Sequence, residues 1–222
     1  MIEFSEKFLT LTIDHFIVHW GVCWVMGVLD YFLYKTNLWS FVKINPPKVP
    51  DTFRGIVRLV LFNQIFVSVP IIYAFADRYV GEIDWTTPFR VLLMFLLMEV
   101  WFYYSHRLLH TRFLYKYIHK VHHSWSYPLC ISTLYAHPIE HGFVNVLAVV
   151  LPAWIVGLPF TLARFWHIIA LVNSILLSHG GFKWLCEQHD VHHVYVTINY
   201  GVLGILDRFH RTDMKNAKKK LM

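Results

Sequence analysis

Residues 88–123 read PFRVLLMFLLMEVWFYYSHRLLHTRFLYKYIHKVHH, an apolar run that passes directly into a segment with five histidines. His106 and His110 are four residues apart, and side chains at this spacing share one face of a helix. The segment ends in the pattern H-x-x-H-H at 119–123, and the same pattern returns at 189–193. We therefore expect the fold to be organised around histidines that stand at the end of an apolar helix.

The composition is typical of a membrane protein. The chain has 222 residues, of which 56% are hydrophobic and 18% aromatic, and its mean hydropathy is +0.45. Soluble domains are usually about 45–50% apolar. The net charge of +6 does not come from a soluble surface rich in Lys and Arg, so we expect no nucleic-acid partner. Cys23, Cys130 and Cys186 are far apart and predict neither a disulfide framework nor a zinc knuckle.

Five apolar runs predict an all-α fold, an integral membrane bundle of about four to five apolar helices. They cover residues 13–34, 59–76, 88–105, 143–158 and 160–178. The connector 35–58 is basic and the loop 77–87 is acidic, which by the positive-inside rule places the connector in the cytosol. The N-terminus is then lumenal, and the histidine clusters form a helical cap on the cytosolic side.

The two apolar runs after the first clusters return the chain to the side it left, whether they span fully or form a re-entrant hairpin. His179 and 189–193 are therefore expected beside the first clusters. Neutral imidazole binds Fe, Zn, Cu and Ni, and so many ligands exceed the needs of one ion, so we expect a di-metal site. Two irons would activate oxygen, whereas zinc would support hydrolysis or structure. The alternative is a histidine-rich helix face whose side chains only reach to the membrane–water interface. It is disfavoured, because buried unpaired imidazoles are costly.

The remaining histidines of the membrane runs are expected to lie outside this site. His15 and His19 repeat the four-residue spacing, but the topology places them toward the opposite side of the membrane. We expect them to be interface residues. His141 and His167 are expected to have satisfied structural roles.

Six strings carry a resemblance to a known superfamily. They are FYYSHRLLH (102–110), HKVHH (119–123), LYAHPIEH (134–141), SHGG (178–181), HDVHH (189–193), and YGVLGILD (200–207) followed by Thr212 and Asp213. Over residues 55–213 the chain resembles the fatty acid hydroxylase and sterol desaturase superfamily, and it is most similar to the C-4 methylsterol oxidase branch. The resemblance implies a multi-pass enzyme of the endoplasmic reticulum membrane with a non-haem di-iron centre. Such enzymes use O2 and electrons from NAD(P)H, delivered through cytochrome b5 and its reductase.

The resemblance also implies a set of site residues. The nine metal ligands would be His106, His110, His119, His122, His123, His179, His189, His192 and His193. His137 would be either a ligand or a group beside one. Glu140 and Asp190 would each orient a neighbouring imidazole. Glu99 shares a helical face with two of the ligands, so we expect it to hydrogen-bond a ligand or to pair with a polar group on another helix. Asn199 matches a family asparagine near the site.

The predicted organisation is a membrane anchor with its basic connector (1–54), a catalytic domain (55–213) and a basic cytosolic tail (214–222). The predicted reaction is O2-dependent hydroxylation of a C–H bond in a sterol or related lipid. Sterol C-5 desaturation, or hydroxylation of a fatty-acyl or sphingolipid substrate, is the alternative on the same irons. A non-catalytic metal-binding membrane protein is the alternative from another class. The chain departs from the family pattern at Arg211, where relatives have Gly, and between His179 and His189, where it is shorter.

Overall fold

The structure is a computed structural model that describes residues 3–43, 53–124, 129–183 and 185–216. These residues contain no β-strand, only helices and two isolated β-bridges, Lys43 to Phe182 and Val80 to Pro159. The predicted all-α class is therefore confirmed. The domain boundary expected at residue 54 lies just after residues 44–52, which are outside the described part of the chain. The last six residues, in the expected tail, are also outside it.

Five helical segments are long and apolar enough to cross a membrane, which confirms the predicted bundle. They are α1 (Phe4–Lys35), α3–η1–α4 (Phe53–Ala76), α5 (Thr87–Leu109), α7–η4–α8 (Pro138–Ile155) and α9–η5 (Phe160–Ser178). The shortest has 18 residues, which at 1.5 Å per residue is about 27 Å, close to the thickness of the hydrocarbon core. The outward-facing apolar side chains of the bundle are exposed in the isolated chain, as lipid-facing residues would be.

Three of these segments contain a π-helical turn within the span. The turns are η1 (Gln64–Ser68), η4 (His141–Val146) and η5 (Ser174–Ser178). Because π-helical turns insert an extra residue, they rotate the side chains that follow and are frequent at functional sites. The η4 turn begins directly after Glu140, and the η5 turn ends directly before His179.

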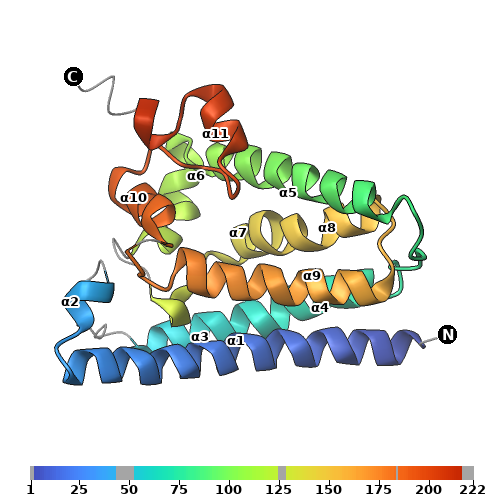
Figure 1. The fold of residues 1–222 in the computed structure, drawn as a ribbon, viewed down its shortest axis with the longest axis horizontal. Helices are drawn as coiled ribbons and strands as arrows, with labels where there is room; N and C mark the ends of the chain where they lie inside the picture. The colour runs from blue at the N-terminus through green and yellow to red at the C-terminus, as the bar shows by residue number, and fades with distance from the viewer. Residues whose placement is uncertain (1–2, 44–52, 125–128, 184, 217–222) are drawn as a thin grey trace.

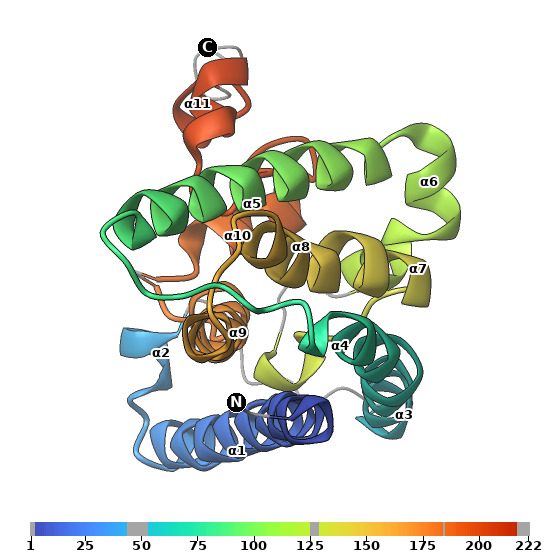
Figure 2. The same ribbon diagram turned by 90° about the vertical axis from the view of Figure 1, so that its right-hand side faces the viewer.

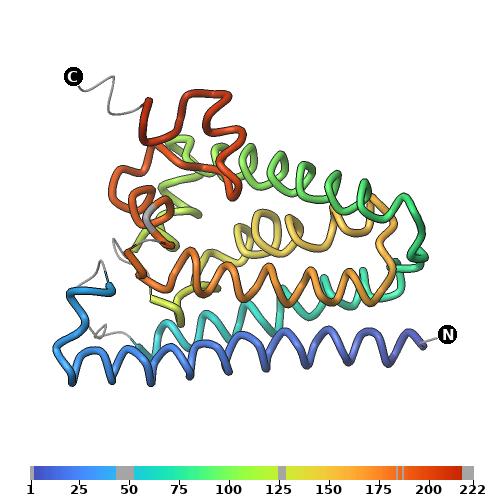
Figure 3. Tube along the Cα trace, viewed as in Figure 1, coloured from blue at the N-terminus to red at the C-terminus, as the bar shows by residue number. Residues whose placement is uncertain are grey.

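The long helices run side by side, and the shorter helices gather at one end of the bundle (Figure 1). Seen from the end, α1 lies at one edge, α9 and α4 pack on it, and α5 lies on α8 at the other edge (Figure 2). The shorter helices include α6 (Arg112–Tyr117), η2 (His119–Ser124), α10 (Glu187–Tyr195) and α11 (Ile205–His210). The chain trace places the N-terminus at the opposite end of the bundle (Figure 3).

The helix α1 begins at Phe4, earlier than the run expected from residue 13, and its inward face carries histidines. His15 is 4% exposed and His19 is fully buried. The expectation that these two are interface residues is therefore wrong. They follow Leu11 at intervals of four residues, so they share the face that α1 packs against α9 and α4.

Candidate metal centre

Four separate segments supply the predicted histidines to one end of the bundle. The last turn of α5 carries His106, and His110 caps the same helix. The 3₁₀ turn η2 carries the 119–123 cluster, His179 follows η5, and α10 carries the 189–193 cluster. The segments meet because α5, α9 and α10 all reach the same end of the bundle (Figure 1).

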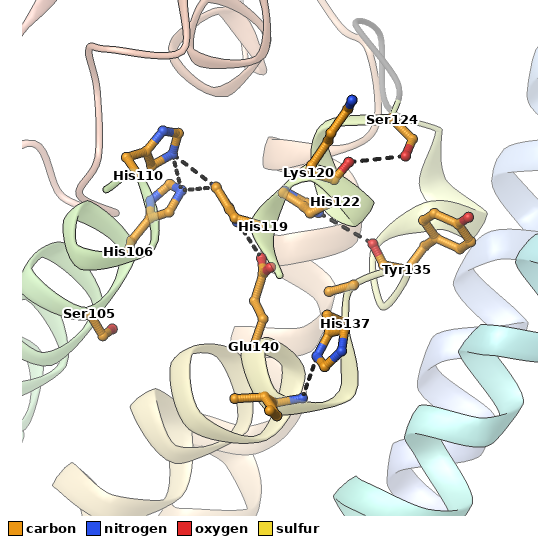
Figure 4. Close-up of polar contacts among 12 residues, drawn as sticks. Ser105, His106, His110, His119, Lys120, His122, Ser124, Tyr135, His137 and Glu140 are labelled. Atoms are coloured by element: carbon orange, nitrogen blue, oxygen red, sulfur yellow. Dashed lines mark hydrogen bonds and ion pairs between the residues drawn. The ribbon is translucent and has the colours of Figure 1, made fainter. Parts of the chain in front are cut away.

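The first group of imidazoles consists of five residues whose ligand atoms all lie within 4.8 Å of one another: His106, His110, His119, His123 and His192. The Nε2 atoms of His106, His110 and His119 are separated by 3.3, 2.8 and 3.2 Å, and Figure 4 shows them converging. Two nitrogens that are each about 2.1 Å from a shared ion lie roughly 3.0–3.4 Å apart. The donor set of this group therefore fits a metal ion.

The second group consists of four residues within the same mutual distance: His122, His179, His189 and His193. The Nε2 atoms of His122 and His193 are 3.2 Å apart. The two groups adjoin, since the ring centroids of His123 and His193 are 4.5 Å apart. The structure thus divides the nine predicted ligands into two neighbouring sets, each large enough for one ion.

Four imidazoles are fixed in orientation by a hydrogen bond from Nδ1 to a backbone carbonyl, and a fifth has its Nδ1 close to a carboxylate oxygen. The four backbone carbonyl contacts are His106 to Tyr200 (2.8 Å), His122 to Tyr135 (3.4 Å), His179 to Ser174 (2.9 Å) and His192 to Ile198 (2.6 Å). Because a carbonyl can only accept, Nδ1 carries the proton and Nε2 keeps its lone pair. The fifth contact is from His119 Nδ1 to Glu140 Oε1, at 2.9 Å. This is how metal-ligating histidines are usually held.

Burial keeps these imidazoles neutral. Loss of hydration lowers the pKa of His122 to about 4 and that of His179 to about 3, and the neighbouring His122 lowers the latter further. The pKa of His110 falls to about 2, mainly through burial and then through His106. Protonated imidazoles cannot bind a metal, so these shifts leave the nitrogen lone pairs available at neutral pH.

The residues expected to support the ligands have different surroundings. Glu140 faces His119, as the sequence led us to expect (Figure 4). His137 belongs to neither group; its Nδ1 accepts from the Ile139 N–H at the start of α7. The Asp190 carboxylate is buried, which raises its pKa to about 7, and it has no hydrogen-bond partner among the described residues. The orienting contact expected of Asp190 is thus not made by the part of the chain that the structure describes.

Glu99 is almost fully buried, but the groups it binds are backbone amides rather than an imidazole. Its two oxygens accept, at 2.7–3.2 Å, the N–H groups of Val202, Leu203, Ile205 and Leu206. The expected ligand imidazole does not take this place, whereas the alternative, a polar group of another helix, does, because Ile205 and Leu206 belong to α11. Glu99 instead anchors the loop whose Tyr200 carbonyl holds His106. Asn199 also serves this loop, since its Nδ2 donates to the Gln188 carbonyl at 3.0 Å.

Two further residues that hold this loop were not assigned a role from the sequence: Gly201 in the loop itself and Asp207 in the first turn of α11. Asp207 is 2% exposed and accepts the N–H groups of Tyr200 and Gly201 at 2.8 and 2.7 Å. A Cβ on Gly201 would lie 2.6 Å from Glu99 Oε1, so only glycine fits there without movement. A buried acid and a glycine within one short apolar string are the signal that could have singled them out.

Arg211, where the resemblance led us to expect glycine, closes α11 with a φ of 58°. This left-handed conformation favours glycine, because a Cβ crowds the backbone there. The departure therefore places an ordinary side chain at a position whose backbone suits glycine. The fold tolerates it, since Thr212 N–H still donates to the Asp207 carbonyl at 2.8 Å.

The fold and the site define a membrane protein with a histidine-rich centre that could hold metal ions. The family model described as fatty acid hydroxylase matches residues 91–212, a range that contains all nine histidines of the two imidazole groups. The chain belongs to the fatty acid hydroxylase family.

Named relatives agree with this membership. Fatty acid hydroxylase domain-containing protein 2 of Homo sapiens is 38% identical over 183 residues, 76% of this chain and 54% of the relative. Methylsterol monooxygenase 1 of Rattus norvegicus is 33% identical over 243 aligned residues, 97% of this chain and 81% of the relative. Very-long-chain aldehyde decarbonylase GL1-8 of Oryza sativa subsp. indica is 32% identical over 214 residues, which are 86% of this chain and 78% of the relative. The chain thus spans about half the length of the human relative. No solved structure matches.

Proposed function

We propose that this protein is a membrane non-haem di-iron monooxygenase that hydroxylates a C–H bond of a sterol, of the 4-methylsterol type, or of a related lipid. The observation that carries the proposal is the pair of adjoining imidazole groups, in which four rings are held by backbone carbonyls at Nδ1 and a fifth faces Glu140. Its ligands would be the nine histidines of the two groups, with His137 serving at most beside them.

The donor set favours two irons over zinc. The first group offers five neutral imidazoles, one more than the four ligands of a structural zinc site, and neither group contains a thiolate. Similarity to a methylsterol monooxygenase over most of both chains supports an oxidative reaction. When bound, two irons would supply O2 activation and C–H oxidation, with electrons from NAD(P)H through cytochrome b5 or a similar carrier.

The protein's own residues would hold and shield this centre. Glu140 and the backbone carbonyls fix the ring orientations, and burial keeps the rings neutral. The centre stands where α5 leaves its apolar run, so a lipid could reach it from the bilayer and an electron carrier from the aqueous side. The basic connector 35–58 supports a cytosolic position for this end, in the endoplasmic reticulum membrane.

Other reactions on the same centre differ in product or in substrate. Desaturation of a sterol at C-5 would follow from hydrogen removal without hydroxyl transfer, and hydroxylation of a fatty-acyl or sphingolipid substrate would use the same oxidation on another lipid. The similarity to an aldehyde decarbonylase covers 78% of that relative, so the family scaffold serves more than one chemistry. A non-catalytic metal-binding protein would hold the metal and form no product.

The experiment combines metal analysis with product analysis. The full-length protein, purified from iron-supplemented cells, would be assayed with a 4-methylsterol, NADPH, cytochrome b5 and its reductase. We expect about two irons per chain and a hydroxylated sterol. His122→Ala and His192→Ala, one from each group, should each lower metal content and abolish turnover. His210→Ala removes a histidine outside both groups and should leave both intact. Metal-free wild-type protein, or unchanged turnover in both group variants, would refute the proposal.

A further inference from the structure

A buried lysine from the N-terminal part of the chain lies at the same end of the bundle as the metal centre. Lys43 directly follows the short helix α2 (Trp39–Val42) and is 3% exposed, and α2 stands at the end that carries α10 (Figure 1). Lysine is almost never buried so fully unless its charge is paired. Lys43 lies outside the range 91–212 that the family model matches, so the match gives no account of it.

The Lys43 ammonium joins the first helix to the segment that follows η5. Its Nζ lies 2.9 Å from Asp30 Oδ1 on α1, donates to the Gly180 carbonyl, and is 3.9 Å from the centroid of the Phe182 ring. A buried ammonium needs an opposite charge and acceptors for its N–H groups, and these three groups supply them. Residues 180–182 are thereby tied to α1 through one side chain.

The backbone around Lys43 pairs with the same segment. Lys43 forms an isolated antiparallel bridge with Phe182, and the Lys183 N–H donates to the Val42 carbonyl at 3.1 Å. The segment also runs close against η5, since a Cβ on Gly180 would lie 2.3 Å from a backbone oxygen of that turn. The path of the chain at residue 180 is therefore fixed both by η5 and by Lys43.

The residue before Gly180 is His179, a member of the second imidazole group. Its Nδ1 donates to the Ser174 carbonyl, whereas its buried Nε2 has no hydrogen-bond partner among the described residues, which leaves that atom available to an ion. His179 is one residue away from the carbonyl that Lys43 holds. A shift of that carbonyl is therefore passed to the His179 backbone and to its ring.

The first imidazole group is held from a different part of the chain. His106 and His192 direct Nδ1 to the carbonyls of Tyr200 and Ile198, which follow α10. A change at Lys43 therefore acts on the second group directly and leaves these contacts of the first group in place.

We propose that Lys43 is a positioning residue of the second metal site: by holding the Gly180 carbonyl, it keeps the His179 imidazole in place to bind the ion. This inference rests on the proposed function, since it presupposes an ion in each imidazole group. It extends the site into the N-terminal part of the chain. The predicted membrane anchor then also braces the metal centre, through Asp30 and Lys43.

The test is a metal titration that needs no turnover. Full-length protein in nanodiscs would be titrated anaerobically with Fe(II) against a chelator, and we expect two bound ions per wild-type chain. Lys43→Met combined with Asp30→Asn removes both charges, so neither is left without its partner. We expect this pair of substitutions to weaken one ion about 10–100-fold, the usual effect of losing a group that orients a ligand, and to leave the other at wild-type affinity. Lys43→Arg, which keeps the charge and the donors, should keep most of the affinity for both.

A matched control makes the same chemical change at the opposite end of the bundle. Lys7 is 8% exposed and its Nζ lies 3.5 Å from Asp77 Oδ1. Lys7→Met combined with Asp77→Asn should leave both ions at wild-type affinity. The same selective loss in this control would show that the effect is a general loosening of the fold, and would overturn the inference.

A double-mutant cycle tests whether Lys43 acts through His179. His179→Ala should weaken the same ion, and adding the Lys43→Met pair to it should cause little further loss, because the ring that Lys43 positions is gone. A full additional loss, equal weakening of both ions, or wild-type affinity for both in the Lys43→Met pair would each overturn the inference.

Two further outcomes are also decisive. If the Lys43→Met pair does not fold, Phe182→Leu removes only the ring beside the ammonium and should weaken the same ion; unchanged affinity there would overturn the inference. Two ions bound without any oxidised sterol would refute the proposed function and leave the inference standing, whereas fewer than two ions in the wild type would refute both.

Discussion

Replacing Gly201 by alanine should weaken metal binding although no ligand is touched. An added Cβ would lie 2.6 Å from Glu99 Oε1 and 3.0 Å from Asp207 Oδ2. Carbon–oxygen contacts are ordinarily about 3.3 Å or longer, so one partner has to move by roughly 0.7 Å. The loop also carries the Tyr200 carbonyl that accepts from His106 Nδ1. The substitution therefore disturbs the orientation of a proposed ligand through the backbone.

The expected loss of metal affinity follows from how firmly the Glu99 carboxylate is held. Glu99 Oε1 accepts the N–H groups of Ile205 and Leu206 at 3.0 and 3.2 Å. Hydrogen bonds to a charged group contribute about 1.5–3 kcal/mol each, so displacing this oxygen costs roughly 3–6 kcal/mol unless the loop moves instead. Movement of the loop would weaken the His106 contact, and loss of such a contact typically lowers metal affinity about 10–100-fold. We expect a loss within this range, with a lower melting temperature.

The assay is a chelator competition on the purified protein, with thermal denaturation alongside. The matched control is Gly27→Ala on α1, where no atom lies within 4 Å of an added Cβ. Gly27→Ala should keep the wild-type metal affinity and melting temperature. If Gly201→Ala also keeps both, the close packing of this loop does not restrain His106, and the reasoning is refuted.

Three further predictions follow from the site. Glu99→Gln keeps the side-chain volume but turns an amide donor toward two backbone N–H groups, so limited proteolysis should cut the 199–204 loop faster than in wild type. An unchanged rate would contradict the anchoring role. Glu140→Gln should lower metal affinity about tenfold by removing the carboxylate that faces His119, as chelator competition would measure; equal affinity would show that the pair is dispensable. Burial lowers the pKa of His122 to about 4, so the folded chain binds fewer protons than the unfolded chain below pH 6.5. The stability of the metal-free protein should therefore be complete above pH 6.5 and fall toward pH 4; a flat melting temperature across this range would contradict the shift.

Much of the scaffold follows from local sequence patterns. The apolar runs predict the five membrane helices, because a helix must satisfy its own backbone hydrogen bonds within lipid. The even number of runs after residue 142 predicts that His179 joins the first clusters, since two crossings return the chain to the same side. The residue types predict the chemistry, because neutral imidazoles that gather in repeated clusters can donate to metal ions.

Other features depend on contacts that no local pattern contains. The helix α1 is apolar on most sides, so its sequence does not mark the face of His15 and His19 that packs on α9. Glu99 hydrogen-bonds backbone amides about a hundred residues later in the chain. Every residue except proline has such an amide, so the sequence does not indicate which ones Glu99 binds. The adjacent residues His122 and His123 belong to different imidazole groups, because the 3₁₀ turn points them in different directions.

The membrane helices, the histidine inventory and the family can be predicted from the sequence, because lipid solubility and ligand chemistry are properties of single side chains. The packing of the helices sets how the histidines divide into two groups, which backbone carbonyl accepts from His106, and which backbone amides Glu99 reaches. These are properties of relative position, and relative position is fixed when the helices pack.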